Sequence, residues 1–406
     1  MNSLAQFTTK DEEELVAHEL SLRIAVDAIA ERTSDIHIDP GQKEGVIKYR
    51  IDGLLQEISR HPLPVISVLL GVIKKAAALK ADEIRTPQEG IVTFTTDKID
   101  KKTVAYTLRI ATFPTCFGER MVLRILDPGK VSFLKGDMGT LGFSEKEEKA
   151  IKSILDKPFG LILYTGPTGC GKTTTAYASL GYLHERTKGR CSIISLENPI
   201  EYHLEGLVQT TVDSEFTHAK ALKALMSQDP DVIFCGEIQN AETARLLMTL
   251  SLTGHLMLSQ LHSSDVAGAL KRLVDIGIEP YLLGMTIEGV IAQRLMRKIC
   301  PHCREEVKSS AEIAGSIPGK GDSPAVLYRG KGCARCHHSG YLGRTAVYEI
   351  LPRHEKLPEL LTRNLSLAEL REELRPLFLA TLRESALWKA KEGITTVEEA
   401  LRCSMV

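Results

Sequence analysis

The spacing of apolar residues predicts two successive architectures along the chain. Leu15, Leu22, Val26 and Ile29 recur at the period of one helical face. Strands are predicted over 34–39, 45–51, 91–95, 107–110 and 121–125, with a turn at Asp39-Pro40-Gly41 and a second helix over 65–79. Together these elements predict a small α+β domain over residues 1–127.

The pattern changes after a linker predicted over 128–142. Near-continuous apolar runs at 160–164, 192–196, 232–235 and 256–259 alternate with helical segments. Such runs are typical of parallel strands that are buried on both faces of a sheet. We therefore expect an α/β domain over 143–406, and a chain that is mostly helical from Cys336 to its end.

The composition is that of a globular protein and restricts the classes of ligand. Of 406 residues, 43% are hydrophobic and 25% are charged, and 51 basic side chains against 52 acidic ones give a net charge of −1. Aromatic residues make up only 5%. Proteins that hold nucleic acid by charge or base stacking carry a basic surplus or more aromatic side chains, so nucleic acid is not expected as the main ligand.

No segment has the pattern of a membrane span or a secretory signal. The most apolar stretch, 65–73, is far shorter than the ~20 residues that a spanning helix needs. The N-terminus carries an acidic run at 11–14, where a signal peptide is basic. We expect a cytoplasmic protein without direct membrane insertion, which reaches a membrane only through a partner.

Four of the nine cysteines form two CxxC pairs, and this spacing predicts a metal site. The pairs are Cys300–Cys303 and Cys333–Cys336, and the segment between them is rich in glycine and proline. Four thiolates with paired spacing suit tetrahedral Zn²⁺ in a closed structural site, which we place at about 298–340. Redox-active CxxC pairs are the alternative.

A phosphate-binding loop lies between a predicted strand and a predicted helix. Residues 166–173 match G-x-x-x-x-G-K-[ST] at every fixed position. In this context Lys172 reaches the β- and γ-phosphates of a nucleoside triphosphate, the Thr173 hydroxyl ligates Mg²⁺, and backbone N–H groups cradle the phosphates. The predicted binding residues are Gly166, Pro167, Thr168, Gly169, Cys170, Gly171, Lys172, Thr173 and Thr174.

Hydrolysis also needs carboxylates that hold Mg²⁺ and activate water. Glu197 ends one predicted strand, Glu201 follows one short turn later, and Glu237 follows another strand. Because the carboxyl ends of parallel strands meet at one edge of a sheet, we expect Glu197 and Glu237 to point toward the phosphates. His255 and His262 bracket a buried strand, where they are placed to sense phosphate or to contact a neighbouring chain.

In this order the motifs resemble those of the secretion and pilus-assembly ATPases. The loop 166–173 is similar to their Walker A box, 197–202 (ENPIEY) to the aspartate box, 228–238 (QDPDVIFCGEI) to the atypical Walker B box and 253–262 to the histidine box. The segments 34–40, 50–53, 109–124, 292–295 and 340–344 also resemble the family. The resemblance therefore covers nearly the whole chain.

The resemblance implies a RecA-like P-loop core, a smaller PAS-like N-terminal domain and a zinc-bound insertion, assembled as a homohexameric ring that hydrolyses ATP with Mg²⁺. It also implies that Glu197 activates water and Glu237 acts beside Mg²⁺. Arg109 and Arg124 would approach the phosphates from the small domain, and Arg344, within the motif 340–344, would bind nucleotide. The tetracysteine is similar to that of the secretion and pilus-extension branches. The implied partners are an inner-membrane platform and cytoplasmic adaptor proteins, with the ring peripheral to the inner membrane.

Five positions depart from the family pattern by losing or weakening charge: Asn198, Lys223, Ser227, Gln239 and Asn240. Since arginines near these positions help to join neighbouring subunits in the family, we expect weaker assembly or turnover, or a stronger dependence on partners. Two alternatives stay open, a nucleotide-binding structural subunit with weak hydrolysis and a nucleic-acid translocating ATPase. The chain also begins almost directly in the small domain, where relatives often carry a further domain that binds a membrane partner.

Overall fold

The structure, a computed structural model, describes residues 10–96, 104–126, 138–308 and 326–405. It divides the chain into two compact units, 1–131 and 132–406. Each unit has its own hydrophobic core, and each is described by itself below. Most of the linker predicted over 128–142 lies outside the described residues.

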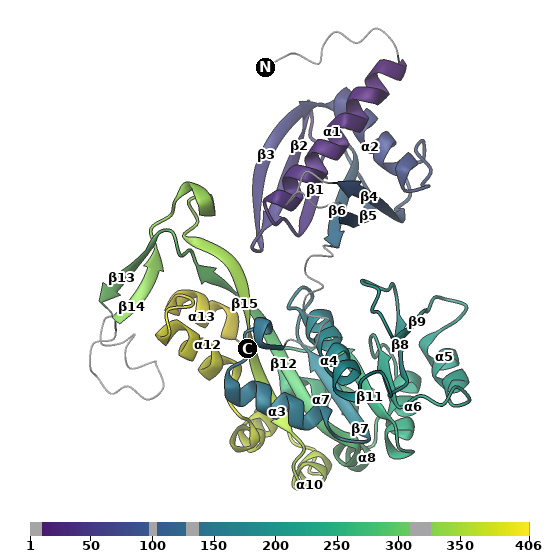
Figure 1. Cartoon of the computed structure of the whole chain (residues 1–406), viewed down its shortest axis with the longest axis vertical. Helices are drawn as coiled ribbons and strands as arrows, with labels where there is room; N and C mark the ends of the chain where they lie inside the picture. The colour runs from purple at the N-terminus through teal and green to yellow at the C-terminus, as the bar shows by residue number, and fades with distance from the viewer. Residues whose placement is uncertain (1–9, 97–103, 127–137, 309–325, 406) are drawn as a thin grey trace. The chain divides into compact units, whose positions relative to one another are not determined.

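The first unit is an antiparallel sheet with two helices on one face (Figure 1). In chain order its elements are α1 (Lys10–Ala30), β1 (Asp35–Asp39), β2 (Glu44–Ile51), β3 (Leu54–Pro62), α2 (Leu63–Ala76), β4 (Glu89–Thr96), β5 (Val104–Thr115) and β6 (Gly118–Leu126). The strand order β3-β2-β1-β6-β5-β4 puts β1 in the interior of the sheet. The predicted α+β character is confirmed, and β3 is a strand that the apolar pattern did not reveal.

The core of this unit lies between the sheet and the two helices. Ile36 and Ile38 of β1 join it, whereas the alternate residues Asp35, His37 and Asp39 lie outside that cluster, as the pleat requires. The predicted apolar face of the first helix is wrong in part. Leu15 and Leu22 are 63% and 40% exposed, and the residues that pack inward include Ala17, Ile24, Ala25 and Ala28. The buried face of α1 therefore includes small alanine side chains, which a pattern of large apolar residues does not reveal.

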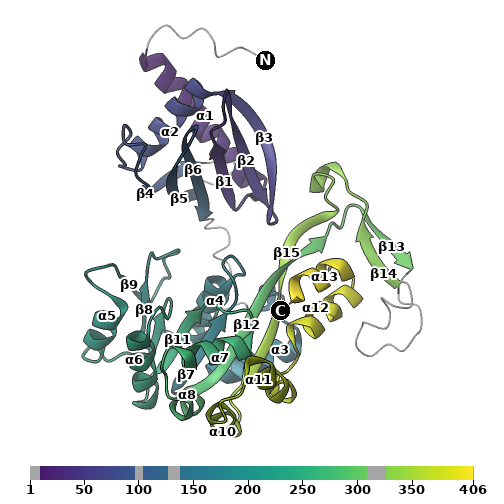
Figure 2. The same ribbon diagram turned by 180° about the vertical axis from the view of Figure 1, so that it is seen from behind.

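The second unit is built on a mostly parallel sheet with helices on both faces (Figure 2). Its first part contains α3 (Glu145–Leu155), β7 (Gly160–Thr165), α4 (Lys172–Thr187), β8 (Ile193–Glu197), β9 (Val208–Thr211), α5 (His218–Leu225), β10 (Val232–Cys235), α6 (Ala241–Leu252) and β11 (Leu256–Leu261). It continues with α7 (Val266–Asp275), α8 (Pro280–Thr286), β12 (Ile287–Ile299), β13 (Arg304–Lys308), β14 (Val326–Gly330), β15 (Tyr341–Pro352), α10 (Leu357–Thr362), α11 (Leu367–Leu374), α12 (Leu382–Lys391) and α13 (Val397–Ser404). The strand order is β15-β12-β7-β11-β10-β8-β9.

Strand β7 shows why the predicted strands are continuously apolar. Leu161 and Leu163 pack into one core with α5–α8, α10 and α11. Ile162 and Tyr164 pack into a second core with α3 and α4. Both faces of the strand are therefore buried, and the predicted parallel α/β sheet is confirmed.

The prediction that the chain is mostly helical after Cys336 is wrong for residues 341–352. This segment forms β15, which pairs antiparallel with β12, and the helices α10–α13 follow it. Val347 to Leu351 is an almost continuous apolar run apart from Glu349, and such a run cannot be told from a buried helix by period alone. Residues Met138–Leu141, at the end of the region predicted as a linker, form a 3₁₀ turn in which Met138 and Leu141 are buried.

Strands β12 and β15 extend beyond the rest of the sheet and carry a small subdomain. The hairpin β13–β14 lies at their extended ends, with α12 and α13 beside them (Figure 1). Met296 and Val347 pack with α12 and α13 in a separate core cluster. Among the described residues, no helix combines the length and the apolar character needed to cross a bilayer.

Candidate nucleotide site and metal centre

The predicted phosphate loop connects β7 to α4, as the motif requires. Gly166, Gly169 and Gly171 have φ values of +150°, +76° and +93°, which only glycine adopts without strain. Pro167, Thr168 and Gly169 are exposed at the tip of the loop, and Thr174 is exposed on the first turn of α4. The loop therefore presents an accessible surface at the N-terminus of a sixteen-residue helix, where the helix dipole favours an anion.

Lys172 is buried and lies on the loop. Its Nζ donates to the carbonyl oxygens of Gly166 (2.7 Å) and Pro167 (3.1 Å). Burial lowers the pKa of Lys172 below its usual value, with Glu237 among the groups that act in the opposite direction. These hydrogen bonds thus hold the ammonium group of Lys172 against the predicted phosphate-binding loop.

His262 links Lys172 to Glu237. Its Nδ1 lies 3.3 Å from Nζ of Lys172, and its Nε2 lies 3.3 Å from Oε1 of Glu237. Because an ammonium group can only donate, Nδ1 is the acceptor, and the Nε2 hydrogen then points to the carboxylate. The structure thus brings together three of the predicted site residues, from α4 and from the segments after β10 and β11.

The carboxylate of Glu201 lies beside Thr173. The Thr173 hydroxyl lies 3.4 Å from Glu201 Oε1, and Gln260 Nε2 lies 3.4 Å from the same hydroxyl. The sequence marked Glu201 as a neighbour of Glu197 but assigned no role to it or to Gln260. The available signal was the aspartate box itself, which contains two glutamates, and the spacing did not show which of them faces the loop.

Glu197 is held in a separate buried network and is only 3% exposed. Its carboxylate accepts hydrogen bonds from Tyr177 Oη, from Ser195 Oγ at 2.6 Å and from Gln209 Nε2 at 3.2 Å. Burial raises the pKa of Glu197, and these three donors act against that rise. Tyr177, Ser195 and Gln209 were not identified from the sequence, because no local motif contains them.

The remaining predicted residues lie elsewhere. His255 precedes β11 and faces Leu250 O, at the opposite end of the strand from His262, so this geometry does not place it at the phosphates. Arg344 of β15 is paired with Arg297 of β12. Arg297 is four positions along β12 from Gln293, the residue of this strand that contacts the loop, so Arg344 is not brought to the loop either. Contact of His255 with a neighbouring chain stays a prediction.

The two small-domain arginines are direct neighbours in the first unit. Arg109 and Arg124 are paired across β5 and β6. Arg109 forms an ion pair with Glu89 at 2.7 Å, and Arg124 forms one with Asp35 at 3.0 Å. Their approach to the phosphates stays a prediction.

Two of the positions that depart from the family pattern have local roles. Asn240 caps the N-terminus of α6, where its side-chain oxygen accepts the N–H of Thr243 at 2.9 Å. Lys223 forms an ion pair with Glu242 at 2.7 Å. The effect of these substitutions on assembly stays a prediction.

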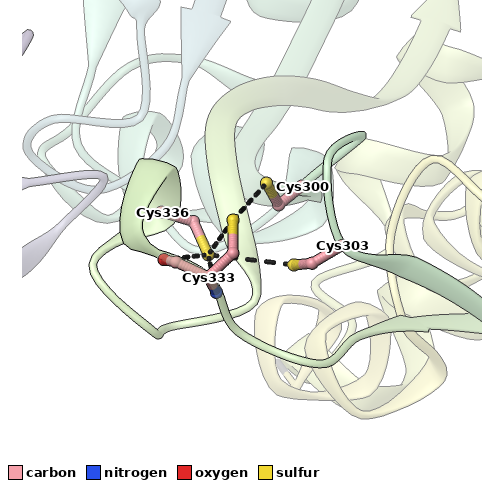
Figure 3. A group of neighbouring side chains, drawn as sticks. All are labelled: Cys300, Cys303, Cys333 and Cys336. Carbon is pink, nitrogen blue, oxygen red and sulfur yellow. Dashed lines mark hydrogen bonds between the residues drawn. The ribbon is translucent and has the colours of Figure 1, made fainter.

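The four predicted cysteines form one cluster at the base of the β13–β14 hairpin (Figure 3). Their sulfur atoms all lie within 4.8 Å of one another. The Cys300–Cys333 and Cys303–Cys336 sulfur pairs are 3.9 Å apart, and Cys333–Cys336 are 3.7 Å apart. Zn–S bonds of about 2.3 Å in a tetrahedron place sulfurs about 3.8 Å apart. Because the thiols of both pairs converge at these distances, the cluster fits one tetrahedral metal ion that all four cysteines share.

Backbone contacts hold the two CxxC pairs together. Cys300 N donates to Gly340 O at 2.9 Å, which joins the first pair to the start of β15. Cys303 N turns back to Cys300 O, and Cys336 N turns back to Cys333 O. Arg335 of the second pair reaches His302 of the first, with 3.1 Å between NH1 and Nε2. The cluster thus closes the subdomain between β12 and β15.

The P-loop lies at the carboxyl edge of a parallel sheet. Glu201 lies beside its Thr173, and Glu237 is linked to its Lys172 through His262. This arrangement defines a P-loop nucleotide-binding protein with a RecA-like core. The chain belongs to the type II/IV secretion system protein family, whose model matches residues 9–402.

Curated relatives and solved structures agree with this assignment. The chain is 40% identical over 380 residues to type II secretion system protein E of Pseudomonas aeruginosa. The aligned residues cover 93% of this chain and 73% of that protein. It is 38% identical over 383 residues to the type IV pilus assembly ATPase PilB of Myxococcus xanthus, covering 93% and 66%. The ATPase DotB of Legionella pneumophila has the same fold, with a TM-score of 0.69 at 18% identity over 99% of this chain and 97% of that one.

Proposed function

We propose that this chain is the ATP-hydrolysing subunit of a ring motor that powers protein secretion across the outer membrane or the assembly of a pilus or pseudopilus. The observation that carries the proposal is the convergence of Lys172, Thr173, Glu201 and Glu237 at one edge of the sheet. The family and the names of the relatives supply the class of machine.

The chemistry follows from what each group can do. Backbone N–H groups of 166–173 and Lys172 bind the β- and γ-phosphates, and Thr173 supplies a hydroxyl ligand to Mg²⁺. Water attacks the γ-phosphorus, the bond to the β–γ bridging oxygen breaks, and ADP and phosphate leave. We assign the orientation and deprotonation of that water to Glu201 in place of Glu197, because Glu201 faces Thr173 and three donors already occupy Glu197. Glu237 then acts beside Mg²⁺ and orients His262.

The remaining parts of the proposal concern assembly. Arg109 and Arg124 reach the phosphates when the two units of a subunit close, so that hydrolysis depends on motion. The subunits form a homohexamer in the cytoplasm, which docks on an inner-membrane platform and adaptor proteins. Cys300, Cys303, Cys333 and Cys336 would hold Zn²⁺, which would stabilise the fold of the subdomain and, with four thiolate ligands, would leave no position open for catalysis. No observation favours nucleic acid as the load.

ATP turnover and oligomer mass, measured on the same samples, test the proposal. Wild type is expected to hydrolyse ATP in proportion to its hexamer content, and Lys172→Ala and Glu237→Gln are expected to be inactive. Wild type that binds nucleotide but turns over no faster than these variants would instead support the structural subunit. Stimulation by DNA would support the nucleic-acid motor.

A further inference from the structure

Gln293 of β12 lies directly against the phosphate loop. Strand β12 runs parallel to β7, with Ala292 opposite Thr165, the last residue before the loop. The side chain of Gln293 is only 1% exposed, and its Nε2 donates to the carbonyl oxygen of Cys170 at 2.8 Å. A residue more than a hundred positions away in the sequence thus contacts the backbone of the loop.

The orientation of this carboxamide is set by one hydrogen bond. The carbonyl oxygen of Cys170 can only accept, so the atom that faces it is the amide nitrogen. The other end of the carboxamide, Oε1, is buried without a partner among the residues that the structure describes. A buried amide oxygen without a donor costs free energy. The hydrogen bond from Nε2 to Cys170 O offsets part of this cost.

Two glycines of the motif fit around Gln293. A Cβ atom at Gly171 would lie 3.0 Å from Gln293 Nε2, and one at Gly166 would lie 2.6 Å from Gln293 O. A Cβ atom at Gly169 would meet nothing within 4 Å. All three glycines have backbone conformations that favour glycine, and Gly166 and Gly171 in addition pack closely against Gln293, which leaves little room for a side chain.

The next residue ties the same strand to the histidine segment. Arg294 NH1 donates to Gln293 O at 3.0 Å, and its NH2 donates to Ser264 O, two residues after His262. Arg272 NH1 donates to the carbonyl oxygen of His262 at 2.6 Å. Side chains of β12 and α7 thus hold backbone carbonyls of the phosphate loop and of the segment 262–264.

We propose that Gln293 is a positioning residue that sets the direction of the Gly171 N–H toward the phosphates. In a trans peptide the C=O and N–H groups point in opposite directions. When Gln293 holds the Cys170 carbonyl toward β12, the N–H of Gly171 in the same peptide points away from β12, into the loop. The inference rests on the proposed function, because it presumes that the loop binds nucleotide phosphates.

Two substitutions remove the hydrogen bond in different ways. Gln293→Met keeps the length of the side chain but has no donor, and Gln293→Asn keeps the amide but is one methylene too short. Thr395→Val is the matched control, because Thr395 is also buried and donates to a carbonyl of β12, that of Arg297, at 2.8 Å. It removes a comparable hydrogen bond at a distance from the loop.

The full-length chain is titrated with Mg²⁺·ADP, and KM and kcat for ATP and the melting temperature are recorded. Both Gln293 variants are expected to raise Kd and KM about five- to tenfold, the effect of one lost buried hydrogen bond, with a smaller change in kcat. Thr395→Val is expected to lower the melting temperature comparably and to leave Kd unchanged. Equal weakening of binding in all three variants, or unchanged Kd in both Gln293 variants, overturns the inference. Wild type that binds no nucleotide refutes the proposed function itself.

Discussion

Tyr177 on α4 donates its hydroxyl hydrogen to the carboxylate of Glu197 at the end of β8. The same hydroxyl oxygen accepts the backbone N–H of Glu201 at 3.3 Å. Burial raises the pKa of Tyr177, with the charge of Glu197 as the next cause, so the phenol stays protonated. The hydroxyl therefore contacts both ends of the segment 197–201, and we infer that Glu197 anchors the segment that carries Glu201.

Glu201→Gln is expected to lower kcat by at least about 100-fold, the usual scale for losing a general base. Binding of Mg²⁺·ADP is expected to change little, because the phosphates are held by the loop and Lys172. Steady-state ATPase kinetics together with ADP titration measure the two effects separately.

Glu197→Gln and Tyr177→Phe are the comparison variants. Each breaks the anchor but leaves the Glu201 carboxylate in place, so we expect a loss of kcat of about tenfold or less and a lower melting temperature. If Glu197→Gln abolished hydrolysis while Glu201→Gln kept it, the original assignment of Glu197 as the base would be correct.

The parts of the site that follow from the sequence are those encoded within a few residues. The P-loop and the two CxxC pairs need only local spacing, and both are where they were expected. The sequence assigned no role to Glu201, because two glutamates four residues apart satisfy the same motif. Which of the two is buried depends on the contacts of Glu197 with Tyr177, Ser195 and Gln209, which the motif does not contain.

Long-range pairing accounts for the other differences. Gln293 lies in the family-like segment 292–295, but the sequence does not show that this segment contacts the loop, because the contact comes from the pairing of β12 with β7. His255 and His262 bracket β11 as the sequence predicted, but the contacts of His262 with Lys172 and Glu237 come from the packing of separate segments. The buried face of α1 consists partly of alanines, which hydrophobic periodicity weights too little.

His262→Ala is expected to lower kcat about ten- to 100-fold, because it removes the link between Lys172 and Glu237. His255→Ala, at the other end of the same strand, is the matched control. We expect it to leave kcat unchanged when it is measured on a sample of the same oligomer mass as wild type. ATPase rates and oligomer mass are measured for both. A loss of kcat in His255→Ala that accompanies loss of hexamer would show that His255 contacts a neighbour. Equal losses without a change in mass would contradict the placement described above.

Metal content tests the tetracysteine cluster. We expect one zinc per chain by elemental analysis, and its loss in Cys300→Ser and Cys333→Ser together with a lower melting temperature, since binding energy at a structural site is folding energy. Cys116→Ser is the control, because Cys116 is exposed and lies in the other unit. Wild type that carries no metal, or a double Cys300→Ser/Cys333→Ser variant with unchanged zinc content, would exclude the site.

Glu349 of β15 gives a pH dependence that can be calculated in sign. It is buried, and its two oxygens accept the first backbone N–H groups of two helices, Val266 of α7 at 3.1 Å and Leu382 of α12 at 3.3 Å. Burial raises the pKa of Glu349 from 4.5 to about 7, and Asp265 adds to the rise, whereas Arg294 and the two N–H groups act against it. Between these two pH values the folded chain holds a proton that the unfolded chain has lost.

Stability is therefore expected to fall as the pH rises from about 4.5 to about 7, and to stay level with respect to this group above that range. The size is at most about 3.4 kcal/mol, from a rise of about 2.5 pKa units at 1.36 kcal/mol each. Glu349→Gln removes the titration, so the melting temperature of wild type minus that of the variant is expected to decrease between pH 5 and pH 8. Glu359→Gln, at an exposed position on α10, is expected to show a difference that does not vary with pH. A difference for Glu349→Gln that is equally flat would mean that this carboxyl keeps its ordinary pKa, and that the two helix N-termini fully offset its burial.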